Sequence, residues 1–114
     1  MAFQKLARVE EIPPGRTKFL YVEKQPVLLA NYAGRIYAVF GLCPHQNNPL
    51  EGATMWGSLI DCPFHHYQYD VTTGENFFPR NVYPKDYKRL EAQLRPLKTY
   101  AVELRDGEVW VNLE

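Results

Sequence analysis

Short segments in which apolar and polar side chains alternate dominate this chain, and turn residues separate them. Such alternation puts every second side chain on one face of a strand and predicts β-structure. Two dipeptides, Ala33-Gly34 and Asp106-Gly107, each separate two such segments and predict β-hairpins. We therefore expect an all-β fold of small antiparallel sheets. The predicted strands cover residues 3–9, 18–22, 27–32, 35–40, 58–61, 67–71, 100–105 and 108–113.

One segment follows a different period. Tyr87, Leu90 and Leu94 lie at helical spacing, and a proline precedes and another follows the segment that contains them. This pattern predicts one short helix near residues 85–95. Residues 80–98 hold six basic and two acidic side chains, a net charge of +4, which indicates a solvated basic face or a docking surface for an acidic partner.

Length and composition narrow the class of protein. A chain of 114 residues suits a single domain, residues 1–114. Its 13 basic and 13 acidic residues give no net charge, which disfavours nucleic-acid binding through phosphate contacts. The first residues show no signal-peptide pattern, so we expect no signal peptide, and no apolar run approaches the roughly 20 residues that cross a bilayer. We expect a cytoplasmic protein that acts without a membrane.

Two short motifs carry the candidate chemistry. The first is Cys43-Pro44-His45, and the second is Cys62-Pro63-Phe64-His65, with 16 residues between His45 and Cys62. Each motif offers one soft thiolate and one imidazole on a tight, proline-containing loop. Two such loops brought together supply four ligands, and the alternation of cysteine and histidine suits two unlike metal ions.

Three other interpretations compete for these residues. The two cysteines could form a disulfide, which a cytoplasmic location disfavours. The same four side chains could hold one structural zinc, although such sites usually take both cysteines from one loop and both histidines from another. They could also be unliganded core residues, although two motifs at this spacing make chance a poor explanation.

The pattern C-x-H, then 16 residues, then C-x-x-H resembles the signature of Rieske proteins. The resemblance extends to the segments around the motifs and to most of the chain. These segments are Asn31 to Val39, Pro49-Leu50, Tyr69 to Glu75 and Pro96 to Tyr100.

The resemblance implies a Rieske fold with a cluster-binding subdomain and one [2Fe-2S] cluster. Cys43 and Cys62 would hold the inner iron, and His45 and His65 the outer one. High-potential members have two further cysteines in a disulfide and a serine where Tyr67 stands here. Hydrogen bonds to sulfur stabilise the reduced state, so the resemblance implies a low potential.

The resemblance also implies a role as an electron carrier and not as an enzyme. Such a ferredoxin takes one electron from a flavin-dependent reductase and passes it to a terminal oxygenase, typically one that hydroxylates aromatic rings. We expect a monomer that docks transiently with both. The alternative is a small Rieske-type subunit of another complex, like that of nitrite reductases. The chain departs from these ferredoxins in the extra residues 80–93, and we expect a loop at residues 76–79 to help cover the cluster.

Overall fold

The computed structural model describes residues 3–43, 48–63, 68–78 and 97–113. The regular structure of the described residues consists of β-strands and one short 3₁₀ helix, η1 (Val9–Glu11), and turns and loops connect these elements. All strand pairs are antiparallel and form three sheets. The predicted all-β fold of small antiparallel sheets is therefore confirmed. The predicted helix at residues 85–95 lies outside the described residues.

The largest sheet has six strands in the order β1-β12-β11-β4-β3-β2. Both predicted hairpins belong to it. Ala33 and Gly34 join β3 to β4 with φ of 55° and 87°, and Asp106 and Gly107 join β11 to β12 with φ of 51° and 77°. Positive φ at both turn residues matches the twist of the flanking strands. The strands are β1 (Gln4–Arg8), β2 (Thr17–Val22), β3 (Gln25–Tyr32), β4 (Arg35–Phe40), β11 (Thr99–Arg105) and β12 (Glu108–Asn112).

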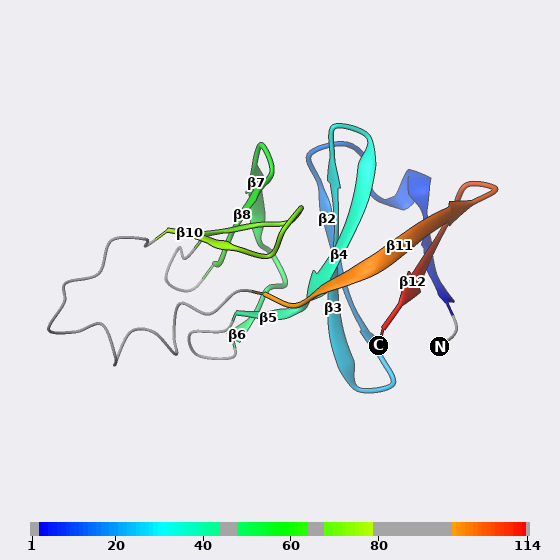
Figure 1. Cartoon of the computed structure of the whole chain (residues 1–114), viewed down its shortest axis with the longest axis horizontal. Coiled ribbons are helices and arrows are strands. Elements are labelled where there is room, and N and C mark those ends of the chain that lie inside the picture. Colours follow the sequence, from blue (N-terminus) through cyan, green and yellow to red (C-terminus); the bar gives the residue numbers. More distant parts are fainter. Residues whose placement is uncertain (1–2, 44–47, 64–67, 79–96, 114) are drawn as a thin grey trace, which may run out of the picture.

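A four-stranded sheet with the order β10-β9-β8-β7 lies beside the first one, and Figure 1 shows it at the left of the six-stranded sheet. A two-stranded hairpin, β5 and β6, lies near the junction of the two sheets (Figure 1). The prediction of a loop at residues 76–79 is wrong for residues 76–78, because these form an edge strand that pairs with β9. The strands are β5 (Leu42–Cys43), β6 (Asn48–Pro49), β7 (Thr54–Trp56), β8 (Leu59–Asp61), β9 (Gln68–Asp70) and β10 (Asn76–Phe78).

Strand β3 separates two hydrophobic cores, and it is buried from Pro26 to Asn31. Leu28 and Ala30 pack in the first core, which lies against the four-stranded sheet, whereas Val27 and Leu29 pack in the second core. Successive side chains of a strand point to opposite faces, so one strand supplies both cores. The first core is formed by Leu28, Ala30, Val39, Leu50, Ala53, Ile60, Cys62, Tyr69, Val71 and Leu97. The second is formed by Ala7, Ile12, Val27, Leu29, Ile36, Ala38, Tyr100, Val109 and Val111.

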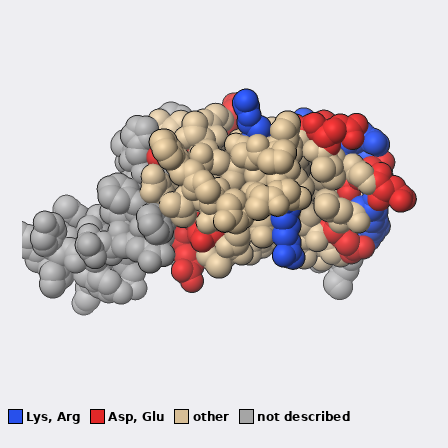
Figure 2. All heavy atoms as spheres, turned by 90° about the horizontal axis from the view of Figure 1, so that it is seen from above, with Lys and Arg blue, Asp and Glu red and all other residues tan. Residues whose placement is uncertain are grey.

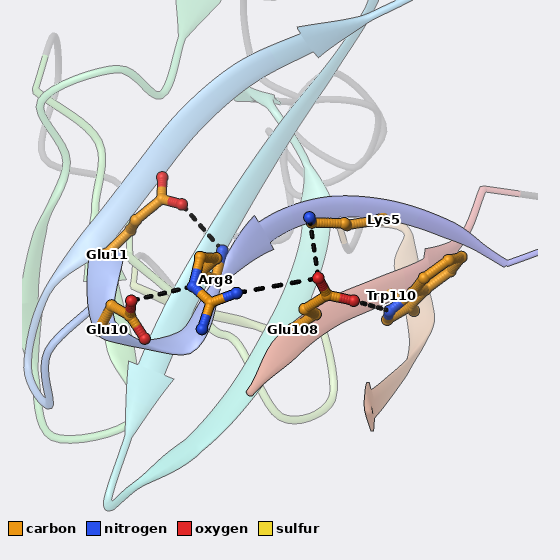
Figure 3. A network of polar contacts seen from close by, with 6 residues as sticks. All are labelled: Lys5, Arg8, Glu10, Glu11, Glu108 and Trp110. Atoms are coloured by element: carbon orange, nitrogen blue, oxygen red, sulfur yellow. Dashed lines mark hydrogen bonds and ion pairs between the residues drawn. The ribbon is translucent and has the colours of Figure 1, made fainter. Parts of the chain in front are cut away.

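A network of polar contacts links β1 to β12 and is drawn in Figure 3. Glu108 accepts hydrogen bonds from Lys5 Nζ at 2.9 Å and from Trp110 Nε1 at 3.3 Å. The contact with Lys5 is the largest cause that lowers the pKa of Glu108. Glu11 forms an ion pair with Lys18 at 2.9 Å, and this contact lowers the pKa of Glu11. The network therefore ties η1 and the first strand to the rest of the six-stranded sheet.

Charged side chains are unevenly distributed over the surface. Figure 2 shows acidic and basic atoms gathered at the end of the molecule that carries the β11–β12 turn, while the middle of this face is largely uncharged. None of the described residues belongs to a helix long and apolar enough to cross a bilayer.

Candidate metal centre

The first motif begins at Cys43, the last residue of β5, which forms a hairpin with β6. Leu42 pairs with Pro49 and Cys43 with Asn48, and residues 44–47 connect these two strands in the sequence. The hairpin places Cys43 directly before this connection. His45 lies within it, outside the described residues.

Two backbone hydrogen bonds fix the base of this hairpin. The amide of Leu50 donates to the carbonyl of Gly41 at 2.8 Å, and the amide of Gly41 donates to the carbonyl of Pro26 at 3.0 Å. A Cβ on Gly41 would lie only 2.8 Å from the Pro26 carbonyl carbon. Only glycine therefore allows this close approach, which holds the first motif against β3.

The second motif begins where β8 ends. Cys62 follows Asp61, the last residue of that strand, and its side chain is fully buried in the first core. Asp61 pairs with Gln68, the first residue of β9, and residues 62–67 connect these two strands in the sequence. His65 lies in that connection, outside the described residues.

The flanks of both motifs meet in the first core. Leu50, just after the first hairpin, packs in the same core as Cys62 and Tyr69. The two motifs are thus anchored on a common set of buried side chains, although 16 residues separate His45 from Cys62 in the sequence. Tyr69 is fully buried in this core.

Leu97, the residue that follows residues 79–96, is also attached to the first core. The amide of Leu97 donates to the carbonyl of Gly74 at 2.7 Å, and Gly74 has a φ of 82°. A Cβ on Gly74 would lie 2.2 Å from the Leu97 carbonyl oxygen. The junction therefore requires glycine, and it packs Leu97 into the core that contains Cys62.

The surroundings of Cys62 fit a sulfur ligand of an iron–sulfur cluster. Cys62 forms no disulfide and offers a thiol that is enclosed by apolar side chains, which suits a soft ligand to iron. Elsewhere in the part of the chain that the structure describes, no three His, Cys, Asp or Glu side chains gather as a metal site. The ligand set Cys43, His45, Cys62 and His65 stays a prediction.

Sequence reasoning missed the contacts that hold these loops. One is the role of Gly41, and another is the hydrogen bond of 3.2 Å from Gln68 Nε2 to Asp61 Oδ2 across the base of the second loop. A glycine two residues before a candidate ligand was the available signal for the first. The second contact depends on the register of β8 and β9, which alternation alone does not give.

Known proteins resemble this chain along almost its full length. A family model described as the Rieske [2Fe-2S] domain matches residues 2–88. The ferredoxin subunit of biphenyl dioxygenase from Pseudomonas sp. (strain KKS102) is 27% identical over 113 residues, which is 98% of this chain and 93% of that protein. The ferredoxin component of the naphthalene 1,2-dioxygenase system from Pseudomonas aeruginosa is 30% identical over 104 residues, or 90% of this chain and 88% of that protein.

Solved structures give the same result. The ferredoxin of Sphingomonas yanoikuyae B1 superposes with a TM-score of 0.79 at 28% identity, covering 99% of this chain and all of that one. A chain in the complex of reduced oxygenase and oxidized ferredoxin in carbazole 1,9a-dioxygenase has a TM-score of 0.76 at 27% identity, covering 98% of this chain and 97% of that chain. The sequence comparison and the structure comparison thus both find ferredoxins of oxygenase systems as similar proteins.

Proposed function

Because this chain belongs to the Rieske [2Fe-2S] domain family, we propose that it is a ferredoxin that delivers single electrons to a terminal oxygenase. Its cofactor is a Rieske-type [2Fe-2S] cluster, which takes up and releases one electron. The chain is an electron carrier and not an enzyme, as its relatives are ferredoxin components of multicomponent systems. The observation that carries the proposal is the match to dioxygenase ferredoxins over 90% or more of this chain.

Four side chains are proposed as ligands: Cys43 and Cys62 for one iron, and His45 and His65 for the other. The burial of Cys62 among apolar side chains supports a position at the inner iron. The β5–β6 hairpin supports Cys43, because it presents this residue at the start of a short loop. Spacing from Cys62 selects His65 over its neighbour His66.

The proposed partners are a flavin-dependent reductase as electron donor and an aromatic ring-hydroxylating oxygenase as acceptor, both docking transiently with a monomeric carrier. The names of the biphenyl and naphthalene dioxygenase relatives support the acceptor class, and the carbazole dioxygenase complex supports direct docking with an oxygenase. These relatives favour this role over a nitrite-reductase-like subunit. A cytoplasmic location and a single domain over residues 1–114 complete the proposal.

The ligand assignment is tested on the purified, cluster-loaded protein. We expect two irons per chain and, after reduction, the rhombic EPR signal of a Rieske centre. Cys62→Ser, His45→Ala and His65→Ala should each abolish the visible absorbance. His66→Ala is the matched control and should keep it. One zinc per chain, or a full cluster in His65→Ala together with its loss in His66→Ala, would refute the assignment.

The carrier role is tested by reconstitution. The protein is added to a flavin-dependent reductase and a ring-hydroxylating oxygenase that lack their own ferredoxin, and product formation is followed. We expect turnover that depends on this protein and that His65→Ala does not restore. Equal turnover with and without the loaded protein, across oxygenases of the biphenyl and naphthalene types, would count against the role.

A further inference from the structure

A carboxylate is held at the base of the second motif's loop. Asp61 is the last residue of β8 and pairs with Gln68, the first residue of β9. Gln68 Nε2 donates a hydrogen bond of 3.2 Å to Asp61 Oδ2. The bond spans the two ends of the loop that begins with Cys62, so it fixes the carboxylate next to this residue.

The side chain of Asp61 lies outside the first core. Ile60 and Cys62 are both fully buried in that core, whereas Asp61 between them is only half-buried. Since successive side chains of a strand point to opposite faces, Asp61 faces away from the core. Its cross-strand neighbour on the other side is Thr54, an exposed residue of the edge strand β7. Substitution of Asp61 therefore changes a charge without opening a cavity.

We propose that Asp61 sets the reduction potential of the bound cluster, its carboxylate favouring the oxidised state. The inference rests on the proposed ligation by Cys62. Reduction adds one negative charge to the cluster, and a fixed negative charge nearby disfavours that step. Adjacent Cα atoms are about 3.8 Å apart, so Asp61 is the direct chain neighbour of the proposed ligand Cys62, although its side chain faces the other side of the strand. Charges more than about 8 Å apart are largely screened at physiological salt, so the effect of Asp61 on the potential should be largest at low ionic strength.

The test compares Asp61→Asn with Asp106→Asn in the cluster-loaded protein. Both substitutions remove one carboxylate, but Asp106 lies in the β11–β12 turn at the far end of the six-stranded sheet (Figure 1), and asparagine tolerates its φ of 51°. In a potentiometric titration followed by EPR, we expect Asp61→Asn to raise the equilibrium constant for reduction about three- to tenfold, where tenfold equals about 59 mV for one electron. Asp106→Asn should leave it within about twofold of the parent.

Salt dependence separates this electrostatic effect from a change in loop structure. The difference between Asp61→Asn and the parent should shrink between about 0.01 M and 1 M salt, because the Debye length falls from about 30 Å to about 3 Å. A difference of the same size at both salt concentrations would show that rearrangement of the loop, and not charge, causes it. That result would overturn the proposal.

A second variant keeps the test decisive if Asp61→Asn fails to hold its cluster. Thr54→Lys adds a cation opposite Asp61 and leaves the hydrogen bond from Gln68 in place. Lysine is well tolerated on edge strands. We expect this variant also to raise the equilibrium constant for reduction. An unchanged potential in every variant that keeps an intact Rieske EPR signal, Thr54→Lys alone included, would overturn the role of Asp61. Absence of that signal from the parent would refute the proposed function itself.

Discussion

The two main sheets of this molecule differ in how they are held together. Strands of the six-stranded sheet have five to eight residues, and two-residue turns with positive φ close its hairpins. Each strand of the four-stranded sheet has only three residues, and its central pair is joined by the loop of the second motif. The first sheet is thus held by its own pairing. The second depends on the core that it shares with β3 and on a few specific anchors.

The same contrast appears in the distribution of charge. Ion pairs from Lys5 and Arg8 to Glu108 link β1 to β12 (Figure 3), and an ion pair between Glu11 and Lys18 links η1 to β2. The junction around Cys62 is formed instead by apolar side chains and backbone hydrogen bonds. Added salt and acid should therefore destabilise the six-stranded sheet first. Changes of side-chain volume should instead have their largest effect on the stability of the region around Cys62.

The largest difference in stability is expected between alanine variants of two glycines that have nearly the same φ. Gly74→Ala places a Cβ 2.2 Å from the Leu97 carbonyl oxygen at φ 82°, whereas Gly34, at φ 87°, has no atom within 4 Å of that position. We expect Gly74→Ala to destabilise the protein by about 3 kcal/mol or more and to release the cluster, and Gly34→Ala to cost about 1 kcal/mol. Urea titrations followed by visible absorbance and far-UV circular dichroism measure both. Equal midpoints for the two variants would contradict the junction described for Gly74.

Adjacent residues of β3 offer the next comparison. Leu28 and Leu29 are both fully buried, but one packs in the first core and the other in the second. Each change to alanine should cost about 2–5 kcal/mol. In Leu28→Ala, the visible absorbance should be lost at a lower urea concentration than the circular dichroism signal, because the cavity opens in the core that contains Cys62. In Leu29→Ala, both signals should move together, and the reverse order would argue against two distinct cores.

The smallest effect concerns Glu108. Its folded-state pKa is lowered, chiefly by the hydrogen bond from Lys5, below an ordinary value near 4.5. A lowered carboxyl pKa stabilises the fold above the unfolded-state value, and this contribution is lost as pH falls through the folded-state value. Glu108→Gln should therefore be slightly less stable at neutral pH and lose less stability on acidification below about 4.5. Thermal unfolding followed by circular dichroism from pH 7 to pH 3 tests this, and a steeper acid loss in the variant would contradict it.

The sequence predicts the regular parts of the fold well. Alternation locates the long strands, and Ala33-Gly34 and Asp106-Gly107 predict their turns, because small or short polar residues accept positive φ. The β2–β3 turn is different. Glu23 and Lys24 both have positive φ, at 50° and 72°, although neither residue type favours it. Strand pairing on both sides imposes this turn, so local sequence could not indicate it.

The site is predicted less completely than the fold. The type and spacing of the cysteines and histidines suggest the ligands, because the chemistry of iron requires those side chains. Strands β5, β6, β7 and β10 were missed, since two or three residues show a period of two only weakly. The equally short β8 and β9 were found because they lie within longer alternating segments, residues 58–61 and 67–71. The contact between Asp61 and Gln68 follows from strand register, which is set by tertiary packing.

The burial of β3 on both faces has a consequence for how the chain reaches this structure. The β3–β4 hairpin pairs residues that are close in sequence through a two-residue turn, and such hairpins form within microseconds. Contacts between distant segments, such as Leu28 with the four-stranded sheet, close longer loops and form more slowly. We expect the hairpin to form early in folding and to serve as a template on which the short strands later assemble. The β3–β4 face of the core that contains Cys62 would then form before the short strands that pack against it.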